Sequence, residues 1–398
     1  MCAALLLQNI LTKSCEFIHE KRLDTLIALA KALVRCESLT MTELGNELSE
    51  MNEISERHSI KRVSNFLSNP HIQNENPRIQ KALAKEVLSY FKAIRIIVDW
   101  TPAIERSHYI LRANLICKHS SIVIYQEVYL EEKVNNTEIQ NHFLKNLRRI
   151  IPEHIKNVLI ITDAGFQGEW YKQVERLGWY FCGRVRNGTQ VLIGQKTKWE
   201  RAKMYAENAT ARIKFLGKGL LAKSNKHEMY MYTYKQALKS IRKKSQRNNP
   251  NACTELKRHI RSYTEGWFIV TNLNNINTSI KKTIINHYKS RMKIEASNRT
   301  TKSTKFGFGL ENSMTKNIER IKILLLIEQI VSFVAWLVGA HKEYTKADRE
   351  FSNGSANGGR RLSLVKLGIR ALKRIAVFSY ETLMEMIHKL ALLEASLC

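Results

Sequence analysis

Aspartate is rare in this chain, and two of its aspartates follow short apolar runs. The aspartates are Asp24, Asp99, Asp163 and Asp348. The β-branched run from Ile94 to Val98 ends at Asp99, and the run from Val158 to Ile161 is followed by Asp163. An α/β sheet usually places its site where strands end, and a carboxylate near an apolar core is costly unless a cation pairs with it. The pattern indicates a Mg²⁺ site, although either aspartate could instead cap the turn that follows.

A third acidic residue lies within a cluster of cations. If residues 279 to 302 form one long helix, a single face about 80° wide at 100° per residue carries the whole cluster. It consists of Tyr288, Arg291, Glu295, Arg299 and Lys302. Such a face combines a metal-binding carboxylate with groups suited to holding phosphates. The alternative is a solvated helix face stabilised by Arg–Glu ion pairs.

The spacing within this cluster is specific. It reproduces the Tyr-Arg-Glu-Lys signature of a transposase family. Two residues separate Tyr288 from Arg291, three separate Arg291 from Glu295, and six separate Glu295 from Lys302. The chain therefore resembles the insertion-sequence-four family of cut-and-paste DDE transposases, from about residue 15 to residue 390. Further matching motifs are Leu39-Thr40, Thr42 to Gly45, Val98 to Trp100, Asp163 to Phe166, Leu177 to Tyr180, Arg184 to Arg186, Thr271 to Leu273 and Gly307 to Leu310.

The resemblance implies a catalytic and metal-binding triad of Asp99, Asp163 and Glu295. It implies two Mg²⁺ ions, for which Mn²⁺ can substitute, with Asp99 bridging them and the other two carboxylates each completing one side. The implied chemistry is in-line displacement at phosphorus. First-strand nicking, hairpin formation, hairpin resolution and strand transfer would excise the element and insert it elsewhere.

The resemblance also implies which residues contact DNA. Trp267 matches the tryptophan on which a flipped base stacks, and Met292 matches the apolar wedge that fills the vacated place. Tyr288, Arg291 and Lys302 would hold nearby phosphates, with Arg299 on the same face. Extruding a base costs a few kcal/mol that such contacts must offset. Trp267 could instead be a packing residue at a core edge, and Met292 could be ordinary core.

Residues 1 to 90 show helical spacing and form the expected DNA-binding region. A first helix is expected over residues 22–36. A short second helix is expected to be capped by Thr42, and a third helix to have Ser59 as its N-cap. In the third helix Ile60, Val63 and Leu67 share one face, while Lys61 and Arg62 project elsewhere as candidate DNA contacts. The arrangement is compatible with a helix-turn-helix-like reader.

The chain as a whole is predicted to be α/β. The resemblance implies a ribonuclease-H-like (retroviral-integrase-like) core interrupted by a β-rich insertion. Its first part covers 91–187 with Asp99 and Asp163, and its second part covers 266–345 with the Glu295 helix. The basic insertion covers 188–265 and includes an exposed loop at 239–251. Residues 346–398 form a C-terminal helical region for DNA binding or dimerisation.

Charge points to the same kind of partner. The chain has 64 Lys and Arg against 36 Asp and Glu, a net charge of +28, which favours a polyanion because binding phosphates releases counterions. The expected partner is double-stranded DNA, as terminal inverted repeats and target, held by a homodimer in the DNA-bound complex. The seven scattered cysteines suggest neither a zinc site nor a disulfide framework.

No membrane partner is expected. The most apolar stretch, residues 321 to 339, contains Lys322, Glu328, Gln329 and Ser332, whose burial in lipid would be costly. A buried core helix is therefore predicted. The N-terminus lacks the features of a signal peptide, so a cytoplasmic location, at the bacterial nucleoid, is expected.

Two other functions remain to be weighed. Residues 217 to 224 nearly form a P-loop, but Ala222 stands where Gly is required and no strand–loop–helix context is expected. The second is a catalytically inactive derivative that binds element ends as a repressor of transposition. It is suggested by Asn298, where relatives usually have an aromatic residue, and by Thr300-Thr301, where they have Asp-Leu.

Overall fold

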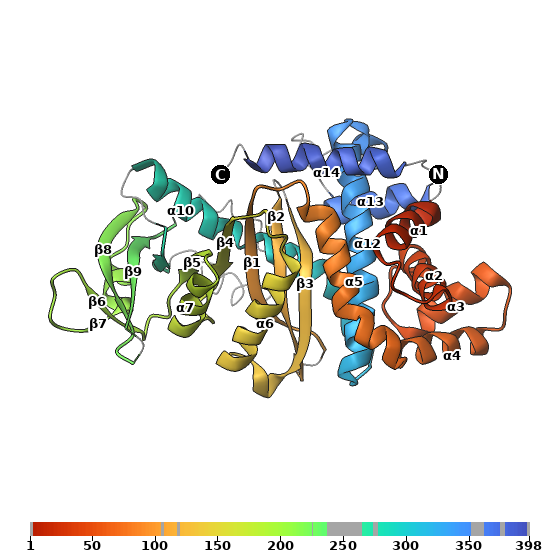
Figure 1. Ribbon diagram of the computed structural model, residues 1–398, viewed down its shortest axis with the longest axis horizontal. Helices are drawn as coiled ribbons and strands as arrows, with labels where there is room; N and C mark the ends of the chain where they lie inside the picture. The colour runs from red at the N-terminus through yellow and green to blue at the C-terminus, as the bar shows by residue number, and fades with distance from the viewer. Residues whose placement is uncertain are drawn as a thin grey trace, which may run out of the picture. The chain divides into compact units, whose positions relative to one another are not determined.

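The computed structural model describes residues 3–104, 107–117, 120–224, 226–236, 265–273, 278–351, 362–374 and 379–395. The chain divides into two compact units. Figure 1 shows their helices and strands, coloured by residue number. Unit 1 comprises Met1–Asn136, Lys145–Lys156 and Met292–Cys398, and unit 2 comprises Thr137–Leu144 and Asn157–Arg291. Asp99 and Glu295 therefore belong to unit 1, and Asp163 belongs to unit 2.

Unit 1 begins with the predicted helical region. Its helices are α1 (Ala3–Ser14), α2 (Glu20–Cys36), α3 (Met41–Asn52), α4 (Glu56–Leu67) and α5 (Pro70–Leu88). Thr40 caps α3 by accepting a hydrogen bond from the Glu43 amide at 3.2 Å, and Ser55 caps α4 through the His58 amide at 3.4 Å. The predicted caps Thr42 and Ser59 are wrong, because a hydroxyl residue available earlier starts each helix and Ser59 is buried inside α4.

The helices α3 and α4 cross at a glycine. A Cβ atom at Gly45 would lie 2.5 Å from the Ile60 side chain and 2.7 Å from the Ile60 Cα. Only a residue without a side chain permits this approach. Val63 and Leu67 of α4 are buried as well, and a helix-turn-helix-like role for this pair stays a prediction.

Three antiparallel strands complete the first part of unit 1. They are β1 (Ala93–Pro102), β2 (His108–Cys117) and β3 (Ser120–Leu130), in the order β3-β2-β1. The register places Asp99 opposite Arg112, and Arg112 opposite Gln126. Side chains of directly paired residues share one face of a sheet, so these three residues form a row on the same face.

The C-terminal helices of unit 1 are built around α12 (Ile318–Tyr344). Among the described residues, α12 is the helix long and apolar enough to cross a membrane, yet 94% of its most apolar window is buried inside the protein. This burial is what a core helix shows. At the crossing with α13 (Leu364–Lys373), a Cβ atom at Gly368 would lie 1.7 Å from the Ala335 carbonyl oxygen, so glycine permits the contact. The last helix is α14 (Tyr380–Ala395).

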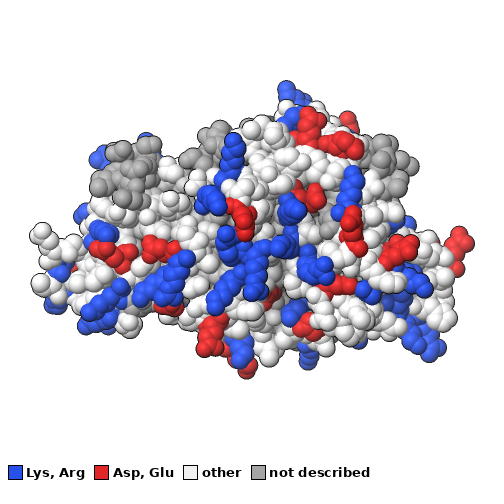
Figure 2. Space-filling model, viewed as in Figure 1, with Lys and Arg blue, Asp and Glu red and all other residues white. Residues whose placement is uncertain are grey.

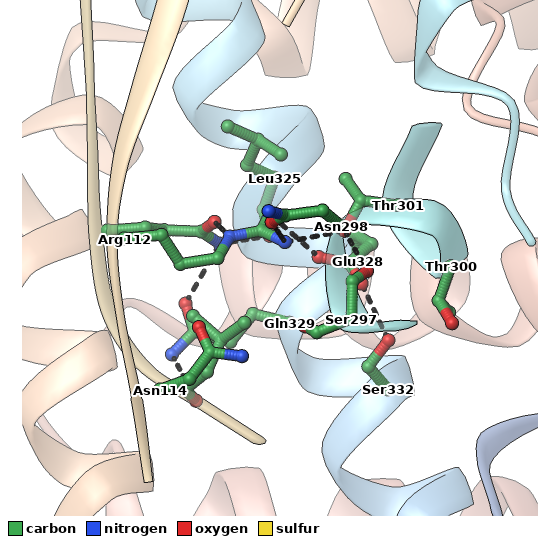
Figure 3. Close-up of polar contacts among 12 residues, drawn as sticks. Arg112, Asn114, Ser297, Asn298, Thr300, Thr301, Leu325, Glu328, Gln329 and Ser332 are labelled. Atoms are coloured by element: carbon green, nitrogen blue, oxygen red, sulfur yellow. Dashed lines mark hydrogen bonds and ion pairs between the residues drawn. The ribbon is translucent and has the colours of Figure 1, made fainter. Parts of the chain in front are cut away.

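A buried polar cluster joins the sheet to the helices of unit 1 (Figure 3). Arg112 is fully buried, and so is Glu328 of α12, whose carboxylate lies 3.8 Å from the guanidinium. Burial lowers the pKa of Arg112 and raises the pKa of Glu328, while the charge of each residue opposes the shift in the other. Arg112 Nε also donates to Gln126 Oε1 at 2.9 Å.

Among the described residues, unit 2 contributes more strands than unit 1. Its strands are β4 (Asn157–Thr162), β5 (Tyr180–Arg184), β6 (Gln190–Ile193), β7 (Glu200–Arg201), β8 (Lys214–Leu221), β9 (His227–Tyr234) and β10 (Trp267–Thr271). Their order is β4-β5-β10-β9-β8-β6-β7. The pair β4–β5 is parallel, and the other pairs are antiparallel.

The described part of the predicted insertion is β-rich, as β6 to β9 show, while the loop at 239–251 lies outside the described residues. Most of the P-loop-like segment, residues 217 to 224, lies in β8, which pairs with β9. A P-loop follows a strand and opens a helix, so this segment is not a P-loop.

The helices associated with the strands are α6 (Thr137–Ile150), α7 (Gly168–Arg176), α8 (Ala202–Glu207), α10 (Thr278–Ser290) and α11 (Lys293–Lys302). Short 3₁₀ turns lie at Glu131–Lys133, Leu310–Asn312 and Ala347–Glu350. The mixed α/β architecture with a large sheet confirms the predicted fold class at that level.

The buried ion pair gives the first prediction. Arg112→Met should lower the free energy of unfolding by about 3–5 kcal/mol, because it leaves the Glu328 carboxylate buried without its partner. The double variant Arg112→Met with Glu328→Leu should recover most of that loss, because it removes both charges. Urea denaturation of the two single variants, the double variant and the wild type measures the difference. Additive losses in the double variant would contradict the pairing.

Candidate active site

Asp99 lies inside strand β1 rather than at its end. The strand continues to Pro102, because residues 96 to 102 pair with β2 in an unbroken register. The prediction that Asp99 follows the strand is therefore wrong in this detail. Its side chain is half-buried, and Thr101, two residues further on, points to the same face because side chains alternate along a strand.

Helix α11, which carries Glu295, packs on this face of β1. Lys302 at the end of α11 donates a hydrogen bond from Nζ to Thr101 Oγ1 at 3.0 Å. Burial lowers the pKa of Lys302, and Arg112 lowers it further, while Glu311 and Asp99 oppose the shift. Asp99 and Lys302 therefore lie close enough to interact electrostatically. Glu295 itself is exposed near the start of α11.

The long helix predicted over 279–302 is interrupted. Helix α10 ends at Ser290 and α11 begins at Lys293, with a turn at Arg291 and Met292. The amide of Arg291 bonds to the Tyr288 carbonyl, three residues back, as at the end of a helix. The single face calculated for Tyr288, Arg291 and Glu295 is therefore wrong, because it assumed continuous helical rotation.

Asp163 directly follows strand β4, as predicted. Its Oδ1 accepts a hydrogen bond from the Gly165 amide at 2.7 Å, so the side chain caps the turn that follows. A carboxylate has about four acceptor sites, and this bond uses one of its two oxygens. The capping role is thus compatible with a second role as a metal ligand.

Aromatic and cationic residues lie near Asp163 in unit 2. Tyr288 is buried, and its ring meets the ring of Trp267 edge to face at 4.9 Å. Burial raises the pKa of Tyr288 to about 12, and the charges of Arg291, Arg184 and Asp163 act on it. Trp267 is partly exposed and also contacts the Tyr234 ring at 5.5 Å. Trp267 therefore packs against its neighbours and still presents part of its surface.

The other predicted DNA contacts lie on the surface. Met292 is 50% exposed at the turn before α11, so it is not an ordinary core residue. Arg299 is exposed and its guanidinium lies 5.6 Å from the ring centre of Phe306. Lys61 and Arg62 are exposed on α4, where Arg62 also donates to Thr25 of α2 at 3.3 Å. These positions leave all four side chains accessible to a ligand.

Basic side chains dominate the charged surface. On the face drawn in Figure 2, lysine and arginine spread over the protein with fewer acidic groups between them. This distribution agrees with the net charge of +28. A surface of this kind attracts phosphates without regard to sequence.

The predicted metal ligands have suitable chemistry. Asp99, Asp163 and Glu295 all offer carboxylate oxygens, which Mg²⁺ prefers, and each carboxylate side chain is at least partly exposed. Among the residues that the structure describes, no three His, Cys, Asp or Glu side chains gather into a group that could hold a metal. The structure brings Asp99 together with α11 in unit 1 and Asp163 together with Tyr288 in unit 2. Convergence of the triad stays a prediction.

Two residues without a predicted role, Arg184 and Arg112, lie beside these groups. Arg184 interacts with Tyr288 and forms an ion pair with Glu265 at 2.6 Å. Arg112 lies opposite Asp99 in the sheet. Arg112 had a signal in the sequence, because an arginine within the apolar run of a predicted strand needs buried polar partners.

A basic α/β chain with carboxylates beside cations and aromatic rings is typical of proteins that act on nucleic acids. A family model described as "Transposase DDE domain" matches residues 92–331, more than half of the chain. The chain therefore belongs to the transposase DDE-domain family. No curated protein matches it. Family membership indicates a transposase that binds DNA, and the matched region includes all three predicted catalytic residues.

The lowered pKa of Lys302 gives a prediction for DNA binding. Its ammonium group loses its proton at a lower pH than an exposed lysine does, so a phosphate contact made by Lys302 weakens as the pH rises. Affinity for duplex DNA should therefore fall more steeply between pH 7 and pH 9.5 in the wild type than in Lys302→Arg, whose guanidinium stays charged. We expect the wild-type profile to be the steeper of the two. Fluorescence anisotropy of labelled duplex DNA in EDTA measures the affinity of each protein at each pH. Parallel affinity–pH curves for the wild type and Lys302→Arg would contradict a phosphate contact by Lys302.

Proposed function

We propose that the protein is a Mg²⁺-dependent DDE transposase that excises an insertion-sequence element and joins it to target DNA. The observation that carries the proposal is the arrangement in unit 1, where Asp99 faces the helix that bears Glu295 and Lys302. The Tyr-Arg-Glu-Lys spacing supports membership of the insertion-sequence-four family. The short motifs, among them Asp163 to Phe166 and Arg184 to Arg186, support a particular likeness to the transposase of the Tn-ten element.

In this proposal the core is ribonuclease-H-like, and Asp99, Asp163 and Glu295 hold two metal ions against one scissile phosphate. When bound, the ions would polarise the phosphoryl oxygens and lower the pKa of the attacking water. The chain's own residues position the DNA: Lys302 and Arg291 bind phosphates. This positioning carries much of the catalysis, because phosphoryl transfer depends mainly on orientation and charge stabilisation.

The remaining steps need a distorted DNA end. A base extruded from the duplex would stack on the exposed part of Trp267, and Met292, exposed at its turn, would fill the vacated place. Nicking would be followed by hairpin formation, hairpin resolution and strand transfer. Two ends must be cut and joined together, so a homodimer is proposed for the DNA-bound complex, in the bacterial cytoplasm at the nucleoid.

The alternative of an inactive, end-binding repressor rests on the departures at Asn298, Thr300 and Thr301. In the structure Asn298 and Thr301 accept hydrogen bonds from Arg112. These two departures are therefore integrated into the fold, and the nicking assay below decides between the enzyme and the repressor.

The triad can be tested against another aspartate of the same chain. Asp99→Ala, Asp163→Ala and Glu295→Ala should each slow nicking of a plasmid bearing the terminal inverted repeats at least about a thousandfold, because several kcal/mol of transition-state stabilisation depends on the metals. Asp24→Ala, at an exposed position on α2, is the control and should nick normally. Gel electrophoresis with Mg²⁺ or Mn²⁺ measures the products.

Two results would overturn parts of this proposal. End binding without nicking by the wild type would establish the repressor, and nicked products from a triad variant would remove that residue from the site.

The proposed role of Met292 as an apolar wedge can be tested separately from the nicking reaction. Met292→Ala should leave the first nick unchanged and lower the yield of hairpins roughly tenfold, because the cost of extruding a base is no longer offset. Met204→Ala is the matched control, since Met204 is 53% exposed on α8. Denaturing gels resolve nicks from hairpins. Equal hairpin yields in the two variants would remove Met292 from this role.

A further inference from the structure

Arg112 connects the strand of Asp99 to the helix of Glu295. Its Nη1 donates to Thr301 Oγ1 at 2.8 Å and to Asn298 Oδ1 at 3.4 Å, both on α11. Its own strand position is directly opposite Asp99. A single guanidinium therefore bonds to α11 (Figure 3), and the residue that carries it is paired with Asp99 in the sheet.

The rest of the cluster holds this guanidinium in place. Gln126 accepts from Nε and donates in turn to the Leu325 carbonyl of α12 at 3.1 Å. The backbone N–H of Gln126 donates to Gln80 Oε1 of α5 at 2.9 Å. Glu328 pairs with the guanidinium and accepts from Ser332 Oγ at 2.6 Å. Strands β2 and β3 and helices α5, α11 and α12 thus share one network.

Helix α11 has further anchors at its two ends. Lys293 donates to the Cys117 carbonyl at 2.6 Å, and its own carbonyl accepts from Ser121 Oγ at 3.1 Å. Lys302 bonds to Thr101 at the other end. Asn298 and Thr301 lie between these end residues, so the Arg112 bonds act on the middle and last turn of a short helix.

We propose that Arg112 is a positioning residue that locks helix α11 against strand β1 and so fixes Glu295 relative to Asp99. The inference rests on the proposed function, in which these two carboxylates hold metal ions. Arg112 is buried, so it acts through α11 and does not touch DNA. A planar guanidinium with five donors in fixed directions suits this role, because several bonds to it define an orientation. Catalytic geometry must be held within about half an ångström.

Two adjacent threonines on α11 provide a matched test. Thr300 and Thr301 are both buried, and each hydroxyl donates to a carbonyl four residues back, at 3.1 Å and 3.3 Å. Of the two hydroxyls, that of Thr301 accepts from Arg112. Valine has nearly the shape of threonine, so Thr301→Val and Thr300→Val differ mainly in the loss of the contacts that the Thr301 hydroxyl makes with Arg112 and with Glu328. Thr301→Ser keeps the hydroxyl and should behave as the wild type.

Single-turnover nicking should be measured at a temperature at which every variant is fully folded, with Mg²⁺ varied at saturating DNA. Thr301→Val should nick about tenfold to a hundredfold more slowly and need more Mg²⁺ for half its maximal rate, with end binding unchanged. Thr300→Val and Thr301→Ser should keep the wild-type values. Equal rates and equal Mg²⁺ requirements for the two valine variants would overturn the positioning role.

Mn²⁺ binding gives a second measurement that does not depend on turnover. Electron paramagnetic resonance of free Mn²⁺, titrated against each protein bound to end DNA, should show several-fold weaker binding to Thr301→Val than to Thr300→Val. Equal Mn²⁺ affinities would overturn the proposal. If the wild type itself fails to nick, the enzymatic function fails, and the two Mn²⁺ affinities still decide whether Arg112 positions these carboxylates.

Discussion

The buried pair of Arg112 and Glu328 is the interaction on which the geometry of unit 1 depends. Two charges about 4 Å apart attract each other by about 4 kcal/mol at an effective dielectric constant of 20. Removing each charge from water costs several kcal/mol, so the attraction alone adds little net stability. Hydrogen bonds to Gln126, Thr301 and Ser332 satisfy further donors and acceptors in the cluster. The cluster therefore ties strands and helices of unit 1 together without a large gain in stability from the ion pair itself.

The three predicted catalytic carboxylates lie on different kinds of backbone element, and each element is held in place in a different way. Asp99 sits within a paired strand, Asp163 in a turn that its own side chain caps, and Glu295 at the start of a short helix. A strand inside a sheet is held by hydrogen bonds on its flanks, and the turn is held by the Gly165 amide. The helix depends on side-chain contacts for its placement. This difference explains why so many polar contacts converge on α11.

Much of the fold could be predicted from the sequence, because local patterns encode it. The apolar run from Val158 to Ile161 lies in strand β4, and the core helix predicted over residues 321 to 339 lies within α12, since apolar runs define both. The break at Arg291 and Met292 could not be predicted, because neither residue is a helix breaker and long-range packing decides the outcome. The buried role of Arg112 was missed for a similar reason. Its partners Asn298 and Glu328 are far away in the chain, and only the folded structure reveals them.

The buried pair also constrains how this sequence can diverge. An uncharged residue at position 112 leaves the Glu328 carboxylate buried without its partner, and an apolar residue at position 328 leaves the Arg112 guanidinium buried without its partner. Either change alone is therefore selected against, whereas a joint exchange of both charges for apolar side chains is tolerated by the fold. Among descendants of this gene, positions 112 and 328 should accordingly covary, even though 216 residues separate them along the chain.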